Sequence, residues 1–104
     1  VPVVFTADLN TTEKGDAYAT MTQNLVDTRF AAKDSVFYGT FHGGKDPSKK
    51  ADYCIDFVLC SDDFKVVSYR TVTKGVQNRF TSDHFPIYAD LKLPLRCPFG
   101  AAAE

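Results

Sequence analysis

The sequence predicts a single α+β domain, built on a mainly antiparallel sheet with one short helix. The chain has 104 residues, enough for one small hydrophobic core and too few for two domains. Five or six short segments are either apolar throughout or alternate apolar with polar residues, as β-strands do. A single segment, residues 16–24, has its apolar residues at helical spacing. We expect the domain to span residues 1–93 and residues 94–104, which have no periodicity, to form a tail.

The composition excludes some classes of protein. The net charge is −1, with 12 basic and 13 acidic residues, so the chain as a whole lacks the basic surface of a nucleic-acid-binding protein. No apolar run approaches the roughly 20 residues of a membrane span. The chain opens inside an apolar run, residues 1–5, and we therefore expect that it was cut at a strand. The three cysteines leave the cellular compartment undetermined.

The first part of the chain is predicted to contain one strand and the helix. Residues 2–7 are a continuous apolar run, which predicts a strand buried on both faces. The helix is predicted over residues 16–24 because Tyr18, Met21 and Leu25 would form one apolar stripe on it. The helix should therefore pack against the sheet through these three side chains.

The middle of the chain leads to the strongest strand of the sequence, residues 51–61. Before it we expect a short extended exit at 25–28, irregular chain at 31–36 and an extended aromatic segment at 37–42. The side chains of the strong strand alternate between one face, with Ile55, Phe57 and Leu59, and another, with Cys54, Asp56, Val58 and Cys60. Cys54 and Cys60 would lie about 20 Å apart in one strand, too far for a disulfide, so we expect both to be buried as small apolar residues.

Two more strands complete the prediction. Residues 64–72 alternate with polar residues, which we interpret as a strand near the edge of the sheet. Residues 87–93 form the final strand. Tyr53, Phe57 and Tyr88 are expected in the core. With one helix to cover so much apolar surface, the sheet looks under-covered, which points to a missing half or to a dimer.

Three polar positions stand where chemistry is often found, at strand ends or inside an apolar strand. Asp83 and His84 lie in a turn just before the final strand, and Asp8 closes the first strand. Asp56 lies within an apolar strand, where a carboxylate is costly to bury without a partner, and His84 is an obvious partner. Asp8 and Asp83 offer the hard oxygen ligands that Mg²⁺ prefers, and Asn10 offers a neutral amide. The alternative is plain structure, in which Asp8 and Asn10 form a hydrogen-bonded turn and Asp83 and His84 another.

These residues carry a resemblance to a known family. Ala7-Asp8-Leu9-Asn10 after an apolar strand resembles the GDFN signature of the endonuclease/exonuclease/phosphatase superfamily, the group that contains DNase I. Residues 51–61 resemble its IDYIFVS strand, and Ser82-Asp83-His84-Phe85-Pro86-Ile87 is similar to its SDHxPV turn. Gly39-Thr40-Phe41-His42-Gly43 resembles a segment of many bacterial members. The four motifs occur in family order, and Ala7 in place of the usual Gly is a small departure.

The resemblance implies a fold and a set of roles. The chain would be the C-terminal half of a DNase I-like four-layer α/β sandwich. Asp8 and Asn10 would orient the nucleophile and the phosphate, Asp56 would hold His84, and His84 would contact the scissile phosphate. Asp83, together with Asp8, would bind Mg²⁺ or Mn²⁺, but weakly, because the family's principal glutamate ligand belongs to the N-terminal half. His42 is a weaker candidate for substrate contact.

Two functions follow as expectations. The first is a metal-dependent phosphoesterase that hydrolyses a phosphodiester or phosphomonoester with water, present here as an incomplete portion. The second is a non-catalytic fragment or interaction module that needs a partner half or a second copy of itself. We expect the 104-residue portion alone to be inactive, because the glutamate ligand is absent. Its substrate, whether nucleic acid, lipid head group or sugar phosphate, does not follow from the sequence.

Overall fold

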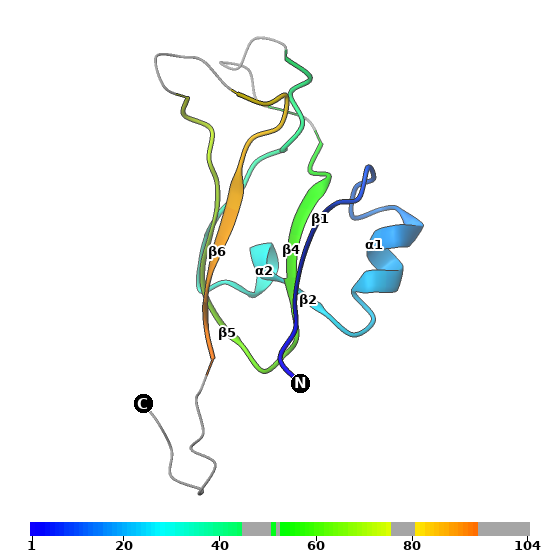
Figure 1. The fold of residues 1–104 in the computed structure, drawn as a ribbon, viewed down its shortest axis with the longest axis vertical. Helices are drawn as coiled ribbons and strands as arrows, with labels where there is room; N and C mark the ends of the chain where they lie inside the picture. Colours follow the sequence, from blue (N-terminus) through cyan, green and yellow to red (C-terminus); the bar gives the residue numbers. More distant parts are fainter. Residues whose placement is uncertain (45–50, 52, 76–80, 94–104) are drawn as a thin grey trace, which may run out of the picture.

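The fold consists of two three-stranded sheets and two short helices (Figure 1). The computed structural model describes residues 1–44, 51, 53–75 and 81–93. The elements in chain order are β1 (Val4–Asp8), α1 (Asp16–Met21), β2 (Val26–Asp27), α2 (Thr28–Ala31), β3 (Asp34–Val36), β4 (Asp56–Cys60), β5 (Lys65–Thr71) and β6 (Ile87–Lys92). The α+β prediction is confirmed, with two short helices where one was predicted. The predicted tail, residues 94–104, lies outside the described residues.

The first sheet has the strand order β1-β4-β2, and both pairings are antiparallel. Helix α1 covers its outer face, on the side away from β5 and β6 (Figure 1). Tyr18, Met21 and Leu25 pack there against Phe57 and Leu59, which are almost fully buried. The apolar stripe predicted for the helix is therefore confirmed, although the helix itself ends at Met21.

The second sheet has the order β3-β5-β6, with β3 parallel to β5 and β6 antiparallel to it. The prediction that residues 64–72 lie near an edge is wrong, because β5 is the central strand of this sheet. Its alternation has another cause: Val66, Tyr69 and Thr71 are buried while the residues between them face outward. An alternating pattern shows that one face is covered and does not show how many strands flank the segment.

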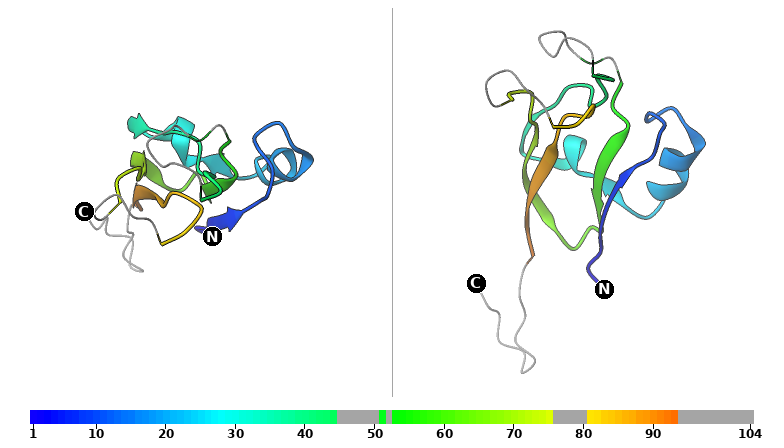
Figure 2. Two further views of the ribbon diagram at one scale, coloured as in Figure 1. Left: turned by 90° about the horizontal axis from the view of Figure 1, so that it is seen from above. Right: turned by 45° about the horizontal axis from the view of Figure 1, so that its top comes forward.

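The sequence prediction missed α2 and β3, and assigned irregular chain to residues 31–36. Helix α2 is a single turn. Its N-terminus is capped by Asp27, whose side chain accepts a hydrogen bond from the backbone N–H of Arg29 at 3.0 Å. A one-turn helix and a three-residue strand are too short to show a periodicity. Helix α2 contacts both β4 and β5, so it joins the two sheets (Figure 2).

The strong strand is shorter than predicted, since β4 begins only at Asp56. Cys54 precedes it and packs with Phe57 and Leu59, on the face opposite to the one predicted. Cys54 and Cys60 are both buried and unbridged, as expected. Tyr53 and Tyr88 were predicted in the core, and this is wrong: 61% of Tyr53 and 47% of Tyr88 are exposed.

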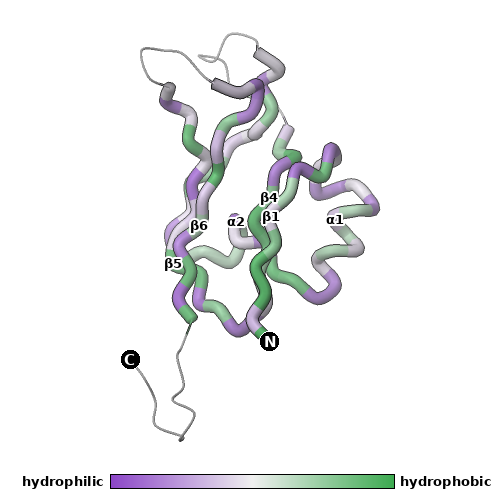
Figure 3. The backbone as a smooth tube through the Cα atoms, in the orientation of Figure 1, coloured by the Kyte–Doolittle hydropathy of each residue, from purple (hydrophilic) through white to green (hydrophobic). Residues whose placement is uncertain are grey.

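Apolar surface remains uncovered on this chain, as the sequence suggested. Figure 3 shows hydrophobic residues concentrated along β1 and β4. The prediction that residues 2–7 are buried on both faces is wrong, because β1 alternates and half of Val4 is exposed. Among the described residues β1 is an edge strand, paired only with β4. No helix in the described part of the chain is long and apolar enough to cross a membrane.

Candidate active site

The register of the first sheet places two carboxylates side by side. Asp8, the last residue of β1, lies directly opposite Asp56, the first residue of β4. Like charges in facing positions of an antiparallel pair are destabilising unless something neutralises them. The side chains that the sequence analysis selected at two distant positions therefore share one end of one strand pair.

His84 lies between these carboxylates. Its Nδ1 is 2.7 Å from Oδ2 of Asp56, and its Nε2 is 3.8 Å from Oδ2 of Asp8. Because an ionised carboxylate can only accept hydrogen bonds, Nδ1 carries a proton and donates a hydrogen bond to Asp56. The pairing of Asp56 with His84 that the sequence predicted is thus present in the structure.

The electrostatics of the site favour the imidazolium form of His84. The hydrogen bond to Asp56 raises the pKa of His84 above its ordinary value, although partial burial opposes this. The negative charges of Asp56, Asp8 and Asp83 act in the same direction. Near neutral pH, His84 is therefore protonated to a greater extent than a free histidine.

Asp83 and Asn10 complete the group of predicted residues. Oδ1 of Asp83 lies 3.7 Å from Nε2 of His84, so two carboxylates face the nitrogen that Asp56 leaves free. Asn10 has a positive φ of 52°, a conformation that asparagine tolerates better than most residues, and its backbone N–H donates to Oδ1 of Asp8 at 2.8 Å. The turn reading of Asp8 and Asn10 is confirmed, and it leaves Oδ2 of Asp8 directed at His84.

Backbone hydrogen bonds from residues 40–43 hold the turn that carries His84 in place. The backbone N–H groups of His42 and Gly43 both donate to the carbonyl oxygen of Asp83 at 3.0 Å. The N–H of Phe85 donates to the carbonyl oxygen of Thr40 at 2.7 Å, and the ring of Phe41 meets the ring of His84 edge to face. These residues were part of a quoted motif, but the sequence analysis gave none of the three backbone groups a role.

His42 does not join the cluster of acidic residues around His84. It is 9% exposed, its ring packs against Phe85 with centroids 4.7 Å apart, and its Nδ1 accepts from the N–H of Gly44. Its contact with a substrate remains a prediction, and the structure gives the residue a packing role beside the His84 turn.

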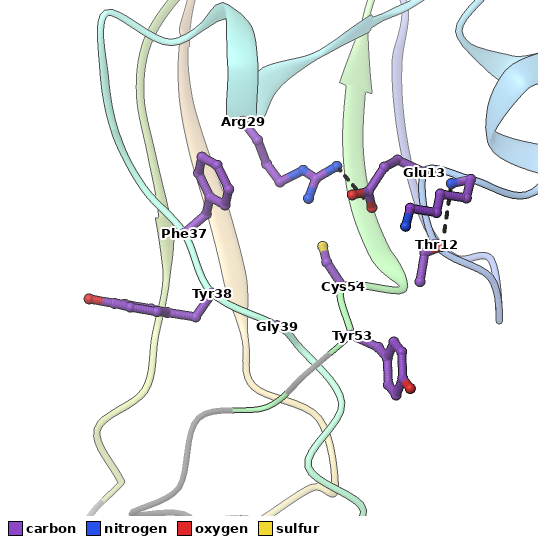
Figure 4. A pocket seen from close by; sticks show the side chains of 9 residues that line it. Thr12, Glu13, Arg29, Phe37, Tyr38, Gly39, Tyr53 and Cys54 are labelled. Atoms are coloured by element: carbon purple, nitrogen blue, oxygen red, sulfur yellow. Dashed lines mark hydrogen bonds and ion pairs between the residues drawn. The ribbon is translucent and has the colours of Figure 1, made fainter.

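A separate pocket of about 350 Å³ lies between the loop after β1 and the segment before β4. Figure 4 shows the side chains of Arg29 and Cys54 directed toward each other there, with Glu13 beside Arg29. Arg29 is 3% exposed and is bound by Asp27 at 2.9 Å, so its charge is already neutralised. The pocket shares no residue with the cluster around His84. This ion pair was not predicted from the sequence, because two opposite charges two residues apart do not by themselves indicate a buried contact.

Among the described residues, one group of side chains could hold a metal ion. Ligand atoms of Asp8, Asp56 and His84 all lie within 4.8 Å of one another. The sequence analysis named Asp8 and Asp83 as ligands. The compact group contains Asp56 instead of Asp83. However, Oδ2 of Asp56 already accepts a hydrogen bond from His84.

No family model matches the chain, and no curated protein matches its sequence. Solved structures do match. An endonuclease/exonuclease/phosphatase from Bacteroides vulgatus is 32% identical, with a TM-score of 0.74, over 88% of this chain and 36% of that one. In fold and in sequence, the chain thus resembles a portion of the endonuclease/exonuclease/phosphatase superfamily fold.

Two further solved structures, both of proteins from Bacteroides thetaiotaomicron, are 27% identical to the chain. One is described as a mannosyl-6-phosphatase and has a TM-score of 0.76, over 89% of this chain and 38% of its own. The other is described as an endonuclease/exonuclease/phosphatase family protein and has a TM-score of 0.77, over 91% of this chain and 39% of its own. The chain thus spans between 36% and 39% of the length of these three structures, which is consistent with the predicted C-terminal portion of the fold.

Proposed function

We propose that this chain supplies part of the active site of a metal-dependent phosphoesterase, an enzyme that hydrolyses a phosphoric ester with water. The observation that carries the proposal is the arrangement around His84. One imidazole nitrogen is fixed by Asp56 at 2.7 Å, and the other faces Asp8 and Asp83 at 3.8 and 3.7 Å. A plain structural turn requires only the first of these contacts.

His84 is the group that would contact the phosphate. Its hydrogen bond to Asp56 fixes both the tautomer and the orientation of the ring, as a carboxylate does in a catalytic triad. The hydrogen bond to Asp56 raises the pKa of His84, which increases the fraction of rings that also carry a proton on Nε2. In that form Nε2 can donate a hydrogen bond, or a proton, to an oxygen of the scissile phosphate. The side chain is 23% exposed, which leaves it accessible to a substrate.

Asp8 and Asn10 would position the attacking water and the phosphate. Because one oxygen of Asp8 is held by the backbone of Asn10, the carboxylate has a fixed direction, and its free oxygen can accept a hydrogen bond from water. The Asn10 side chain is exposed and can donate to a phosphoryl oxygen without adding negative charge.

The donor set fits a hard divalent cation. Asp8 and Asp83 are exposed carboxylates that face the same nitrogen, and Mg²⁺ or Mn²⁺ is typically held by one or two carboxylates and several waters. These two residues would hold the ion in this chain. When bound, the ion would neutralise charge on the phosphate and lower the pKa of its bound water.

The site in this chain is incomplete in our proposal. The chain spans less than two fifths of the length of its structural neighbours. The remainder of the fold would supply the principal glutamate ligand, and it would cover apolar side chains that are exposed here, such as Val4 and Tyr88. A second copy of this chain is the other candidate for that cover. The alternative function is a non-catalytic fragment or interaction module that needs this partner half or a second copy of itself.

For the substrate we propose a phosphomonoester on a small organic group. One neighbour, at 27% identity, is described as a mannosyl-6-phosphatase. The net charge of −1 gives this chain no general attraction for the polyanionic backbone of nucleic acid. Both facts favour a small substrate over DNA or RNA.

Hydrolysis assays test the proposal. We expect the complete protein to hydrolyse p-nitrophenyl phosphate or mannose 6-phosphate with Mg²⁺, and to lose this activity when EDTA removes the ion. His84→Ala and Asp56→Asn should each lower kcat by about 100-fold or more. Asp63→Ala, which removes an exposed carboxylate in the turn after β4, is the control and should leave kcat unchanged.

Two further measurements separate the alternatives. The 104-residue chain alone should be inactive, and light scattering should show whether it is a monomer or a dimer. Recovery of activity on adding the remaining portion would establish that the two portions together form the site. Absence of hydrolysis in the complete protein, with both ester classes and several divalent ions, would reject the phosphoesterase and leave the interaction module.

A further inference from the structure

Thr40 is the residue whose contacts link the two halves of the His84–Asp56 pair. It is fully buried, with 0% exposure. Its Oγ1 accepts hydrogen bonds from the backbone N–H groups of Ile55 at 3.0 Å and Asp56 at 3.3 Å. Asp56 is the first residue of β4 and Ile55 precedes it, so the hydroxyl fixes the backbone from which the Asp56 carboxylate projects.

The backbone of Thr40 holds the other partner. Its carbonyl oxygen accepts from the N–H of Phe85 at 2.7 Å, immediately after His84. Its own N–H donates to the carbonyl oxygen of Tyr53 at 2.8 Å, which ties the segment to the chain that enters β4. One buried residue therefore bonds to the main chain beside Asp56 and to the main chain beside His84.

The approach that allows these contacts depends on the residue before Thr40. A Cβ atom on Gly39 would lie 2.2 Å from the carbonyl oxygen of Ala51 and 2.8 Å from the nitrogen of Tyr53. Only glycine permits the two backbones to come so close. The Gly39-Thr40 pair thus brings the segment against the start of β4 and places a hydroxyl there.

A threonine side chain is needed at this point for a chemical reason. The N–H groups of Ile55 and Asp56 have an acceptor in Oγ1, and a buried donor without a partner is costly. Valine has the same shape as threonine but offers no acceptor. Serine offers the acceptor but lacks the methyl group. These two substitutions separate the hydrogen bonds from the packing.

We propose that Thr40 is a positioning residue for the hydrolysis: its hydroxyl and carbonyl set the 2.7 Å contact between Asp56 and His84 that the reaction uses. The inference rests on the proposed function for its catalytic consequence, but the contact itself is tested separately. Thr40 does not touch the substrate in this proposal. Its effect passes through the orientation of the Asp56 carboxylate and the His84 ring.

The experiment compares Thr40→Val and Thr40→Ser in the complete protein. A proton on Nδ1 held by a carboxylate gives a far-downfield ¹H NMR signal, and His84→Ala assigns it by removing it. We expect Thr40→Val to lose or broaden this signal and to lower kcat by about 10- to 100-fold with little change in KM, because small misplacements of catalytic groups have effects of this size. Thr40→Ser should keep both the signal and the rate close to those of the wild type.

Thr28→Val is the matched control. Thr28 is also fully buried, and its hydroxyl donates to the carbonyl oxygen of Val58 on the same strand, at 2.7 Å. This variant should lose stability in urea as Thr40→Val does, yet keep the His84 signal and kcat. An equal fall of kcat in Thr28→Val would show that general loss of stability explains the effect, and would overturn the proposal.

The remaining outcomes are also decisive. A normal signal and normal kcat in folded Thr40→Val would refute the positioning role. If Thr40→Val does not fold, Thr40→Ser decides, because loss of the signal in that folded variant contradicts a role for the hydroxyl. If the wild-type protein hydrolyses no phosphoric ester, the phosphoesterase proposal fails, while the NMR signal still tests whether Thr40 sets the Asp56–His84 contact.

Discussion

The buried ion pair between Asp27 and Arg29 gives the sharpest prediction for stability. Asp27 is 7% exposed and Arg29 3%, and Oδ2 of Asp27 lies 2.9 Å from Nη2 and 3.2 Å from Nε of the guanidinium. Oδ2 also accepts from the hydroxyl of Tyr18 at 2.8 Å. Asp27→Ala therefore removes the partner of a buried cation, a helix cap and the acceptor of a tyrosine.

The magnitude can be worked from these contacts. Removing one member of a buried ion pair costs about 3 to 5 kcal/mol, and losing an N-cap costs about 1 kcal/mol. Glu13, 4.0 Å from Arg29 and partly exposed, compensates part of the lost charge. We expect Asp27→Ala to lower the free energy of unfolding by about 4 kcal/mol, a large part of the roughly 5 to 15 kcal/mol that stabilises a small domain.

Urea denaturation followed by circular dichroism measures this change. Asp34→Ala is the matched control: Asp34 pairs with Arg70 at 2.7 Å, but its side chain is 65% exposed, so its loss should cost much less than the loss of Asp27. Adding Arg29→Met to Asp27→Ala should recover part of the lost stability, because the unpaired buried charge is then gone. The reasoning is refuted if Asp27→Ala costs no more than Asp34→Ala.

Other predictions concern the site and its turns. The hydrogen bond to Asp56 raises the pKa of His84 in the folded chain. The contribution of His84 to stability is therefore complete below the unfolded pKa of about 6.5 and declines as the pH rises through the folded pKa. Urea midpoints measured across this pH range should show the decline in the wild type and a flatter profile in Asp56→Asn. Asn10→Gly should keep the stability of the positive-φ turn but lower kcat, whereas Asn10→Ala should also lower the free energy of unfolding by about 1 kcal/mol; equal stability of the two variants would contradict this. Gly39→Ala should destabilise the chain by about 1 to 3 kcal/mol in thermal or urea unfolding, because its Cβ would meet backbone atoms, and an unchanged melting temperature would argue against the close approach.

The sequence predicted the pairs that have a strong local reason to form. A carboxylate in an apolar strand requires a partner, so Asp56 indicated a contact, and His84 was the titratable group suited to it. The stripe of Tyr18, Met21 and Leu25 predicted how the helix packs, since its periodicity is set by the helix itself.

Several of the contacts that sequence reasoning missed form between segments that are distant along the chain. Thr40 carries no local signal of its position, because its partners lie thirteen or more residues away along the chain. Tyr53 and Tyr88 were assigned to the core by their aromatic character, yet which face of a strand is covered depends on neighbours outside the strand. Helix α2 was missed because a single four-residue turn is too short for a helical pattern to repeat.

The outer edge of β1 has a consequence for work with the isolated chain. Only β4 pairs with β1 among the described residues, so the N–H and C=O groups along the other side of β1 are available to a strand from another molecule. Its neighbourhood, Val3-Val4-Phe5, is apolar and uncharged, which is the kind of edge that templates aggregation. Purified without a covering partner, the chain should therefore form β-rich aggregates as its concentration rises. A lysine in place of Thr6, an exposed residue in the middle of this edge, should delay that onset without touching the catalytic cluster.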